Sequence, residues 1–138
     1  MESVPTSGSD RLDQPVLRVL LVEDSPILGE LLTRMLASEP EIDVTGRADT
    51  APGAVEALRA TPPDVVVLDL HLREGTGYDV LREANAAGSA TTFVVLSNHA
   101  GDRHRRAALD AGARFFFDKS REIPALVGLL RKLATERA

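Results

Sequence analysis

The order of apolar and polar positions along the chain alternates five times between a strand pattern and a helix pattern. Short apolar runs bounded by helical patterns are typical of buried parallel strands. The predicted strands are Val16 to Val22, Ile42 to Ala48, Val65 to Leu68, Phe93 to Leu96 and Ala113 to Phe117. The predicted helices are Pro26 to Ser38, Ala51 to Ala60, Tyr78 to Ala87, Asp102 to Ala111 and Ile123 to Thr135.

The helix boundaries rest on residues that start and stop helices. Ser25 is a suitable N-cap for the first helix, and Pro26 fits the first helical position because no amide hydrogen is needed there. Apolar residues then recur on one stripe, namely Leu28, Leu31, Leu32, Met35 and Leu36. Gly88 and Gly112 follow two later helices, at positions where a left-handed residue is favoured.

Units of strand, helix and strand with short connections form right-handed crossovers, which put helices on both faces of a parallel sheet. The sequence therefore predicts an α/β fold, a doubly wound five-stranded parallel sheet with five helices. We expect residues 16–138 to form this domain. Residues 1–15 lack apolar periodicity, so we expect a disordered N-terminal tail there. After the last helix only residues 136–138 follow, too few for a second domain, so we expect a stand-alone domain.

Composition narrows the class of protein. The chain has 138 residues, 43% apolar and 27% charged, as soluble globular domains do. No stretch approaches the ~20 apolar residues of a bilayer span, and we expect no membrane insertion. The absence of cysteine excludes disulfides and thiolate metal sites and suits a cytosolic protein. The net charge of -5 disfavours nonspecific binding to nucleic acid.

Polar groups suited to phosphoryl chemistry follow four of the predicted strands. Glu23 and Asp24 follow the first strand, Asp69 the third, Ser97 the fourth and Lys119 the fifth. Open parallel sheets bind ligands in the crevice outside the carboxyl ends of their strands. The topology is therefore expected to gather all of these groups at one place.

Three carboxylates at one edge of the sheet favour the binding of a cation. Glu23, Asp24 and Asp69 would repel one another there, and an oxygen-only ligand set selects Mg²⁺ or Mn²⁺. The alternative for the acid pair alone is a solvated turn whose negative charge meets the positive end of the first helix.

Asp69 stands in an otherwise apolar strand, where burying an unpaired carboxylate costs several kcal/mol. A carboxylate can attack phosphorus and form an aspartyl phosphate. Lys119 supplies a point charge for phosphoryl oxygens, and the Ser97 hydroxyl can donate a hydrogen bond to one. Taken singly, Lys119 would be a surface lysine and Ser97 a turn residue, and only their places after successive strands favour the functional interpretation.

This set resembles the response-regulator receiver domains of two-component signalling, and the resemblance covers about Leu17 to Leu133. It implies a flavodoxin-like sheet with strand order 2-1-3-4-5. It also implies that Glu23 and Asp24 hold Mg²⁺ and that Asp69 accepts the phosphoryl group. Ser97 would be the hydroxyl switch, and Lys119 would contact the phosphate.

Further positions match the same family. The main-chain carbonyl of His71 would complete the metal ligands, and Phe116 occupies the place of the switch aromatic. Gly77 matches the glycine of the loop after the third strand, and residues 111–114 match the turn before the fifth. By the resemblance, phosphorylation draws Ser97 toward the phosphoryl group and lets Phe116 turn inward.

The chain departs from the family at two places. Arg73 stands where a proline is common four residues after the phosphoacceptor, and Ser120 follows Lys119 where a proline is common. The second change puts the geometry of the Lys119 loop in question, because only a bond to proline forms a cis peptide easily. Neither departure removes a reacting group.

His71 and His99 flank the predicted site from two loops, and we expect exposed side chains that do not bind metal. The resemblance implies that these two positions tune the rate of autodephosphorylation. Residues 103–106 form a basic cluster, which on an acidic protein is more simply a solvated helix face than a nucleic-acid patch. In the family, the corresponding helix joins the fifth strand and fifth helix in the surface that meets a target or a second receiver.

The sequence-based hypothesis is a phosphorylation-activated signalling switch in a bacterial cytoplasm, with a histidine kinase or a histidine phosphotransfer protein as donor. It is not expected to be an enzyme beyond its own phosphorylation and dephosphorylation. One alternative is a receiver-like binding module that works without phosphorylation. Another is a Mg²⁺-dependent phosphatase of the haloacid-dehalogenase type, but that family places a second aspartate where this chain has His71, and we expect no cap domain.

Overall fold

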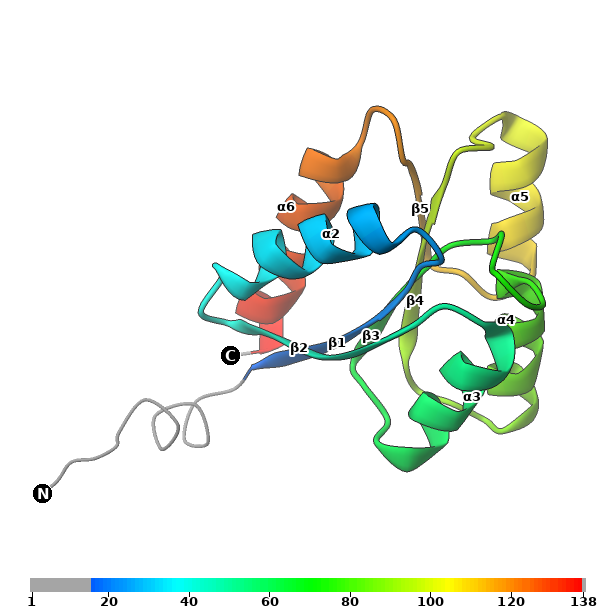
Figure 1. Ribbon diagram of the computed structural model, residues 1–138, viewed down its shortest axis with the longest axis horizontal. Coiled ribbons are helices and arrows are strands. Elements are labelled where there is room, and N and C mark those ends of the chain that lie inside the picture. Colours follow the sequence, from blue (N-terminus) through cyan, green and yellow to red (C-terminus); the bar gives the residue numbers. More distant parts are fainter. Residues whose placement is uncertain (1–15, 138) are drawn as a thin grey trace, which may run out of the picture.

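Five parallel strands form one sheet in the order β2-β1-β3-β4-β5 in the computed structural model, which describes residues 16–137 (Figure 1). The strands are β1 (Leu17–Val22), β2 (Ile42–Ala48), β3 (Val65–Leu68), β4 (Thr92–Ser97) and β5 (Phe115–Asp118). The helices are α2 (Pro26–Ala37), α3 (Ala51–Ala60), α4 (Gly77–Ala86), α5 (Asp102–Asp110) and α6 (Ile123–Arg137). The predicted fold class and strand order are confirmed.

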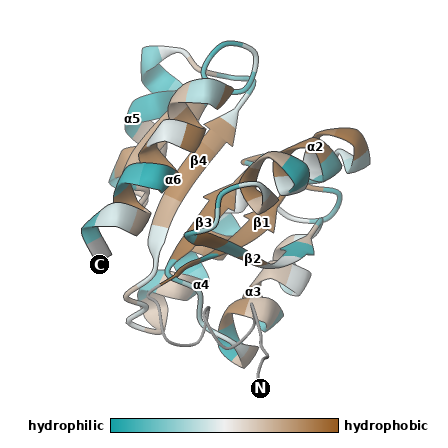
Figure 2. Ribbon diagram, turned by 90° about the vertical axis from the view of Figure 1, so that its left-hand side faces the viewer, coloured by the Kyte–Doolittle hydropathy of each residue, from teal (hydrophilic) through white to brown (hydrophobic). Residues whose placement is uncertain are grey.

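The sheet separates two apolar layers. Helices α2 and α6 cover one face, and α3, α4 and α5 cover the other (Figure 1). Side chains alternate along a strand, so Val19 and Leu21 of β1 pack with the α2 and α6 layer, whereas Leu20 and Val22 pack with the other layer. The central strands are apolar on both faces, which Figure 2 shows as brown ribbon between the helices.

The predicted start of the first helix is confirmed. The Ser25 hydroxyl accepts a hydrogen bond from the Leu28 amide at 3.2 Å, and Pro26 is the first residue of α2. The two predicted left-handed glycines are also confirmed, with φ of 68° at Gly88 and 117° at Gly112. Local capping therefore sets where these helices begin and end.

The fifth strand begins later than predicted. Ala113 lies in the turn that closes the end of α5, where its amide donates to the carbonyl of Ala108 at 3.0 Å. The pairing of β5 with β4 starts only at Phe115, opposite Val94. The prediction that the strand begins at Ala113 is therefore wrong by two residues. Apolar character alone did not distinguish a buried helix cap from a strand.

The predicted N-terminal tail lies outside the described residues. None of the helices in residues 16–137 has the length and apolar character that crossing a bilayer requires.

Helix α2 offers a matched test of the packing. Leu32 is 1% exposed and lies in the core, whereas Ile27 on the same helix is 84% exposed. We predict that Leu32→Ala lowers the free energy of unfolding by about 2–4 kcal/mol, because it leaves a cavity. Ile27→Ala should change it by less than about 0.5 kcal/mol. Urea denaturation measures both, and equal losses for the two variants would contradict this assignment of the core.

Candidate functional site

The acidic residues meet because of the register of two neighbouring strands. Val22 at the end of β1 lies opposite Leu68 at the end of β3, so Glu23 and Asp69 leave the sheet side by side. The Asp69 amide donates to the Val22 carbonyl at 2.9 Å, which fixes the two chain segments together. The sheet edge predicted to carry the site is therefore where these residues lie.

Glu23, Asp24 and Asp69 form one cluster, in which an oxygen of each side chain lies within 4.8 Å of the others. Glu23 and Asp69 are buried, since 7% and 3% of the surface of the whole residue is exposed, and Asp24 is exposed. This donor set consists of carboxylate oxygens and is open to solvent on one side, as a site for Mg²⁺ or Mn²⁺ requires. Among the described residues it is the one group with the spacing of a metal site.

The Lys119 ammonium lies among these carboxylates. It donates a hydrogen bond to Asp69 Oδ2 at 2.8 Å, and it lies 3.0 and 3.1 Å from the two carboxylate oxygens of Glu23. All three side chains are nearly shielded from solvent, at 10% exposed for the lysine and 4% for each acid. The predicted convergence of the first, third and fifth strands is thus present as an ionic contact.

The protonation of this contact follows from burial and hydrogen bonding. Burial raises the pKa of Glu23 above its usual value, and the hydrogen bonds from Ser25 and Lys119 only partly offset it. Burial by itself would lower the pKa of Lys119, but its hydrogen bonds to Asp69 and Glu23 outweigh that effect and raise it. Lys119 is therefore held as a cation at neutral pH.

The other oxygen of Asp69 is also held. Asp69 Oδ1 accepts a hydrogen bond from the His71 amide at 3.2 Å, so the loop after β3 turns back over the carboxylate. Gly77 makes this close turn feasible, because a Cβ there would lie 2.6 Å from the Asp69 carbonyl oxygen and 3.0 Å from Leu70 Cα. Any side chain at that position would push α4 away from the site.

Ser97 at the end of β4 is fully buried. Its hydroxyl oxygen accepts a hydrogen bond from the His99 amide at 3.1 Å. Its carbonyl accepts one from the Lys119 amide at 3.0 Å, so Ser97 and Lys119 are joined through the backbone of adjacent strands. A hydroxyl in this place can change partner without any movement of the sheet.

Phe116 is buried at 5% exposure, among side chains of the α3, α4 and α5 layer. The sequence-based expectation had this ring turning inward only after phosphorylation. In this structure the ring already lies inward in the unmodified chain, because it packs in the core and is covered on its outer side by Arg105.

The two predicted loop histidines lie together at the rim. The ring centroids of His71 and His99 are 4.8 Å apart, and both residues are exposed as expected. His104 from α5 adds a third ring, with its centroid 5.4 Å from that of His99. Sequence reasoning did not connect His104 with the site, because its distance from the other two depends on how α5 is placed.

Arg73, which stands where the family commonly has proline, holds its loop by hydrogen bonds to another loop. Its guanidinium donates two hydrogen bonds to the Asp49 carboxylate, at 3.0 and 3.3 Å, and its amide donates to the Asp49 carbonyl at 3.0 Å. These contacts tie the loop after β3 to the loop after β2. The rigidity that proline would supply locally is supplied here by a neighbouring loop, and nothing in the sequence indicated Asp49 as the partner.

Ser120, the second departure, stabilises the turn that carries Lys119. Its amide and hydroxyl donate to Asp118 Oδ1 at 2.9 and 2.8 Å. The described residues contain no cis peptide bond, and Lys119 nevertheless reaches the carboxylates. The replacement of proline therefore leaves the lysine in position.

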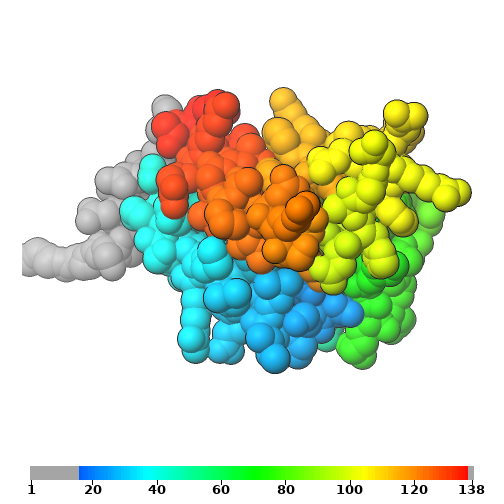
Figure 3. Space-filling view, turned by 90° about the horizontal axis from the view of Figure 1, so that it is seen from above, coloured from blue at the N-terminus to red at the C-terminus, as the bar shows by residue number. Residues whose placement is uncertain are grey.

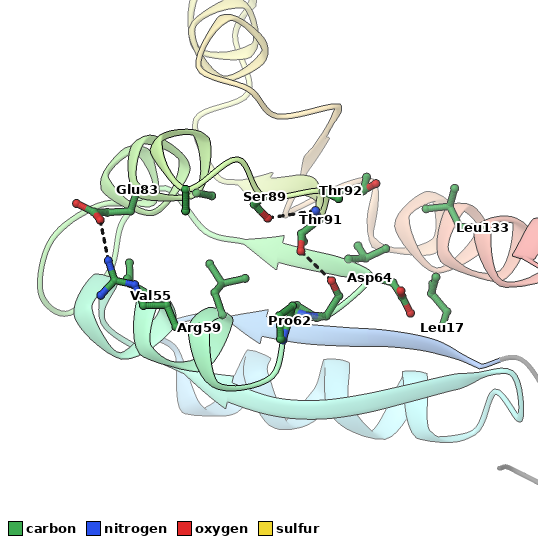
Figure 4. A pocket seen from close by; sticks show the side chains of 16 residues that line it. Leu17, Val55, Arg59, Pro62, Asp64, Glu83, Ser89, Thr91, Thr92 and Leu133 are labelled. Atoms are coloured by element: carbon green, nitrogen blue, oxygen red, sulfur yellow. Dashed lines mark hydrogen bonds and ion pairs between the residues drawn. The ribbon is translucent and has the colours of Figure 1, made fainter.

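A groove of about 670 Å³ lies at the opposite edge of the sheet (Figure 4). The starts of β1, β3 and β4 line it at Leu17, Val65 and Thr92, and the Arg59–Glu83 ion pair spans 3.3 Å beside it. It contains none of the residues predicted for phosphoryl chemistry.

The comparisons with known proteins agree with this geometry. The sequence profile described as the response regulator receiver domain matches residues 19–131. A protein-glutamate methylesterase/protein-glutamine glutaminase of Rhizobium etli is 38% identical over 97 residues, which cover 70% of this chain. The match spans only 28% of that relative's length.

Two solved structures are similar in fold. The signal receiver domain of the putative response regulator NarL from Mycobacterium tuberculosis has a TM-score of 0.80 and 26% identity, covering 88% of this chain and 98% of that one. The response regulator domain of Thermotoga maritima CheB has a TM-score of 0.77 and 25% identity, covering 87% and 97%. With the profile match over most of the sequence, the chain belongs to the response regulator receiver domains of two-component signalling.

Proposed function

We propose that this chain is a phosphorylation-activated switch of a bacterial cytoplasm in which Asp69 accepts a phosphoryl group from phosphohistidine on a kinase or a phosphotransfer protein. The observation that carries the proposal is the 2.8 Å contact between Lys119 Nζ and Asp69 Oδ2 inside a cluster of three carboxylates. A nucleophile, a cation and an acidic metal-type donor set then lie within one small site.

The residues fit a divalent cation. Glu23, Asp24 and Asp69 would hold Mg²⁺ or Mn²⁺, with the main-chain carbonyl of His71 as a further ligand. When bound, such a cation neutralises charge on the phosphoryl oxygens. Lys119 supplies a second positive charge at the same carboxylate, and its raised pKa keeps that charge present at neutral pH.

The transfer itself needs few protein groups. An Asp69 oxygen attacks phosphorus in line, the P–N bond to the donor histidine breaks, and the bonding electron pair stays on the imidazole nitrogen. Lys119 exchanges its hydrogen bond to Asp69 for one to a phosphoryl oxygen. The Ser97 hydroxyl, whose oxygen accepts from the His99 amide, donates its own hydrogen to another.

The new dianion changes the surface through Ser97 and Phe116. Engagement of the Ser97 hydroxyl by the phosphoryl group stabilises the buried position of Phe116. The conformation of the surface formed by α5, β5 and α6 changes with it. A shift of a two-state equilibrium from 1:99 to 99:1 requires about 5.5 kcal/mol of differential stabilisation. That surface would meet a downstream protein or a second receiver.

The exposed apolar side of α2 is the proposed docking place for the donor. Ile27 is 84% exposed and Leu31 48%, one helical turn apart, and the helix begins two residues after Asp24, at Pro26. A helix of a phosphotransfer partner packed there would bring its histidine close to Asp69. Large apolar side chains exposed beside an active site are typical of binding surfaces.

The first test of this function is intact mass after incubation with acetyl phosphate or phosphoramidate. We predict a gain of about 80 Da, one phosphoryl group, that needs Mg²⁺ and is lost in Asp69→Ala. Asp110→Ala, an exposed carboxylate on α5, is the matched control and should be modified like the wild type. No adduct on a folded wild-type chain, with rapid turnover excluded, would instead favour a module that works without phosphorylation.

Removal of the Lys119 side chain should make the stability of the fold depend on Mg²⁺. In Lys119→Met the acid cluster loses its counter-charge, and we predict a loss of about 3 kcal/mol in the free energy of unfolding without Mg²⁺. Millimolar Mg²⁺ should restore most of it and should stabilise this variant more than the wild type. Lys132→Met, the exposed lysine of α6, is the control. Equal stabilisation of wild type and Lys119→Met by Mg²⁺ would contradict binding of the cation by the carboxylates that Lys119 contacts.

The loop histidines should set the lifetime of the phosphoryl group. Their rings stand at the rim and restrict the approach of water to Asp69, so the double variant His71→Ala/His99→Ala should lose its phosphoryl group severalfold faster. His104→Ala, on α5 with its ring centroid 5.4 Å from that of His99, should have a smaller effect. The decay of the mass adduct measures this, and equal half-lives for the double variant and the wild type would overturn the assignment.

A further inference from the structure

Arg105 differs from its neighbours in the basic cluster of α5. Arg103, His104 and Arg106 are exposed, whereas Arg105 is partly buried, with its side chain 40% exposed. The guanidinium points toward β5 and the turn before α6, where it makes contacts with both. Arg105 is therefore the member of the cluster that packs against β5 and the turn before α6.

The contacts of Arg105 converge on the switch aromatic. Arg105 Nη1 donates a hydrogen bond to the Phe116 carbonyl oxygen at 3.1 Å. The guanidinium carbon lies 5.0 Å from the centroid of the Phe116 ring, within the range of a cation–π contact. Arg105 thus holds both the backbone and the ring of this residue.

A third contact extends this arrangement toward the phosphorylation site. Arg105 Nη2 lies 3.9 Å from Glu122 Oε1, and that oxygen also accepts a hydrogen bond from the Asp118 amide at 2.9 Å. Asp118 directly precedes Lys119, which contacts Asp69. Figure 3 shows α5, in yellow, beside the orange segment that leads into α6. Side chains therefore connect α5 continuously with the loop of the active lysine.

We propose that Arg105 is a positioning residue that keeps Phe116 in its buried place and thereby raises the readiness of Asp69 to be phosphorylated. The cation–π contact exists only while the ring lies under the guanidinium, so it stabilises the buried position over an outward one. This inference rests on the proposed function, since it assigns a regulator to the same switch.

The effect on the phosphorylation rate follows from the population of the buried ring. If the chain accepts the phosphoryl group only while the ring is buried, the rate is proportional to the fraction of molecules in that state. A partly exposed cation–π contact and one hydrogen bond together correspond to about a 3- to 10-fold effect. We expect Arg105→Ala to slow phosphorylation by acetyl phosphate by up to about this factor.

The position of the ring can be observed directly. The chain has four phenylalanines, so incorporation of 4-fluorophenylalanine gives four ¹⁹F resonances, and Phe116→Leu identifies that of Phe116. In Arg105→Ala the Phe116 resonance should move toward the position of a solvent-exposed ring or broaden, while the other three change little. Saturation with beryllofluoride and Mg²⁺ should return it toward the wild-type position.

Two variants separate a positioning role from general charge effects. Arg106→Ala removes an exposed arginine from the same helix and should leave the Phe116 resonance and the phosphorylation rate unchanged. Arg105→Lys keeps the charge but lacks the planar guanidinium, and it should restore the rate only in part. An unchanged Phe116 resonance in Arg105→Ala, or an equal change in Arg106→Ala, would overturn the proposal.

The ¹⁹F resonance and the phosphorylation rate test the role of Arg105 and the proposed function separately. If the wild type takes no phosphoryl group, the proposed function is wrong, but the ¹⁹F spectrum of the unmodified chain still tests whether Arg105 holds the ring. If the wild type is phosphorylated at Asp69 and Arg105→Ala is phosphorylated at the same rate, the function stands and the role of Arg105 is excluded.

Discussion

The ionic contact of Lys119 with Asp69 and Glu23 is the interaction on which the site depends. Three carboxylates within 4.8 Å repel one another, and two of them are buried where water cannot screen the repulsion. The ammonium at 2.8 Å from Asp69 makes this proximity stable. In the proposed function Lys119 exchanges its hydrogen bond to Asp69 for one to a phosphoryl oxygen, so the contact that stabilises the fold is also the one that phosphorylation would change.

Strand pairing and hydrogen bonds in the neighbouring loops hold this contact in place. Asp69 is fixed by the register of β1 with β3, and the loop beyond it is tied down by Arg73 and Asp49. The Lys119 turn is held by Ser120 and by the carboxylate of Glu122. The two positions that lack the family's common prolines therefore acquire their rigidity from hydrogen bonds to neighbouring side chains.

Much of this arrangement could be predicted from the sequence because it follows from strand ends. The second and third strands have the predicted bounds, and Glu23, Asp69 and Lys119 lie together as parallel topology requires. The contacts of Asp49, His104 and Arg105 were not predictable, since each depends on how two loops or a helix are placed across the sheet. The roles of Ser97 and Phe116 follow from the family resemblance and stay predictions.

The proposed function requires that Asp69 itself forms the acyl phosphate, and reduction with borohydride identifies the residue that is modified. Borohydride converts an aspartyl phosphate to homoserine, and trypsin releases the segment between Arg59 and Arg73, which contains Asp64 and Asp69. We predict homoserine at position 69 alone, after incubation with phosphodonor and Mg²⁺. Homoserine at position 64, at Asp24 or nowhere in a chain that carries the phosphoryl mass would contradict it.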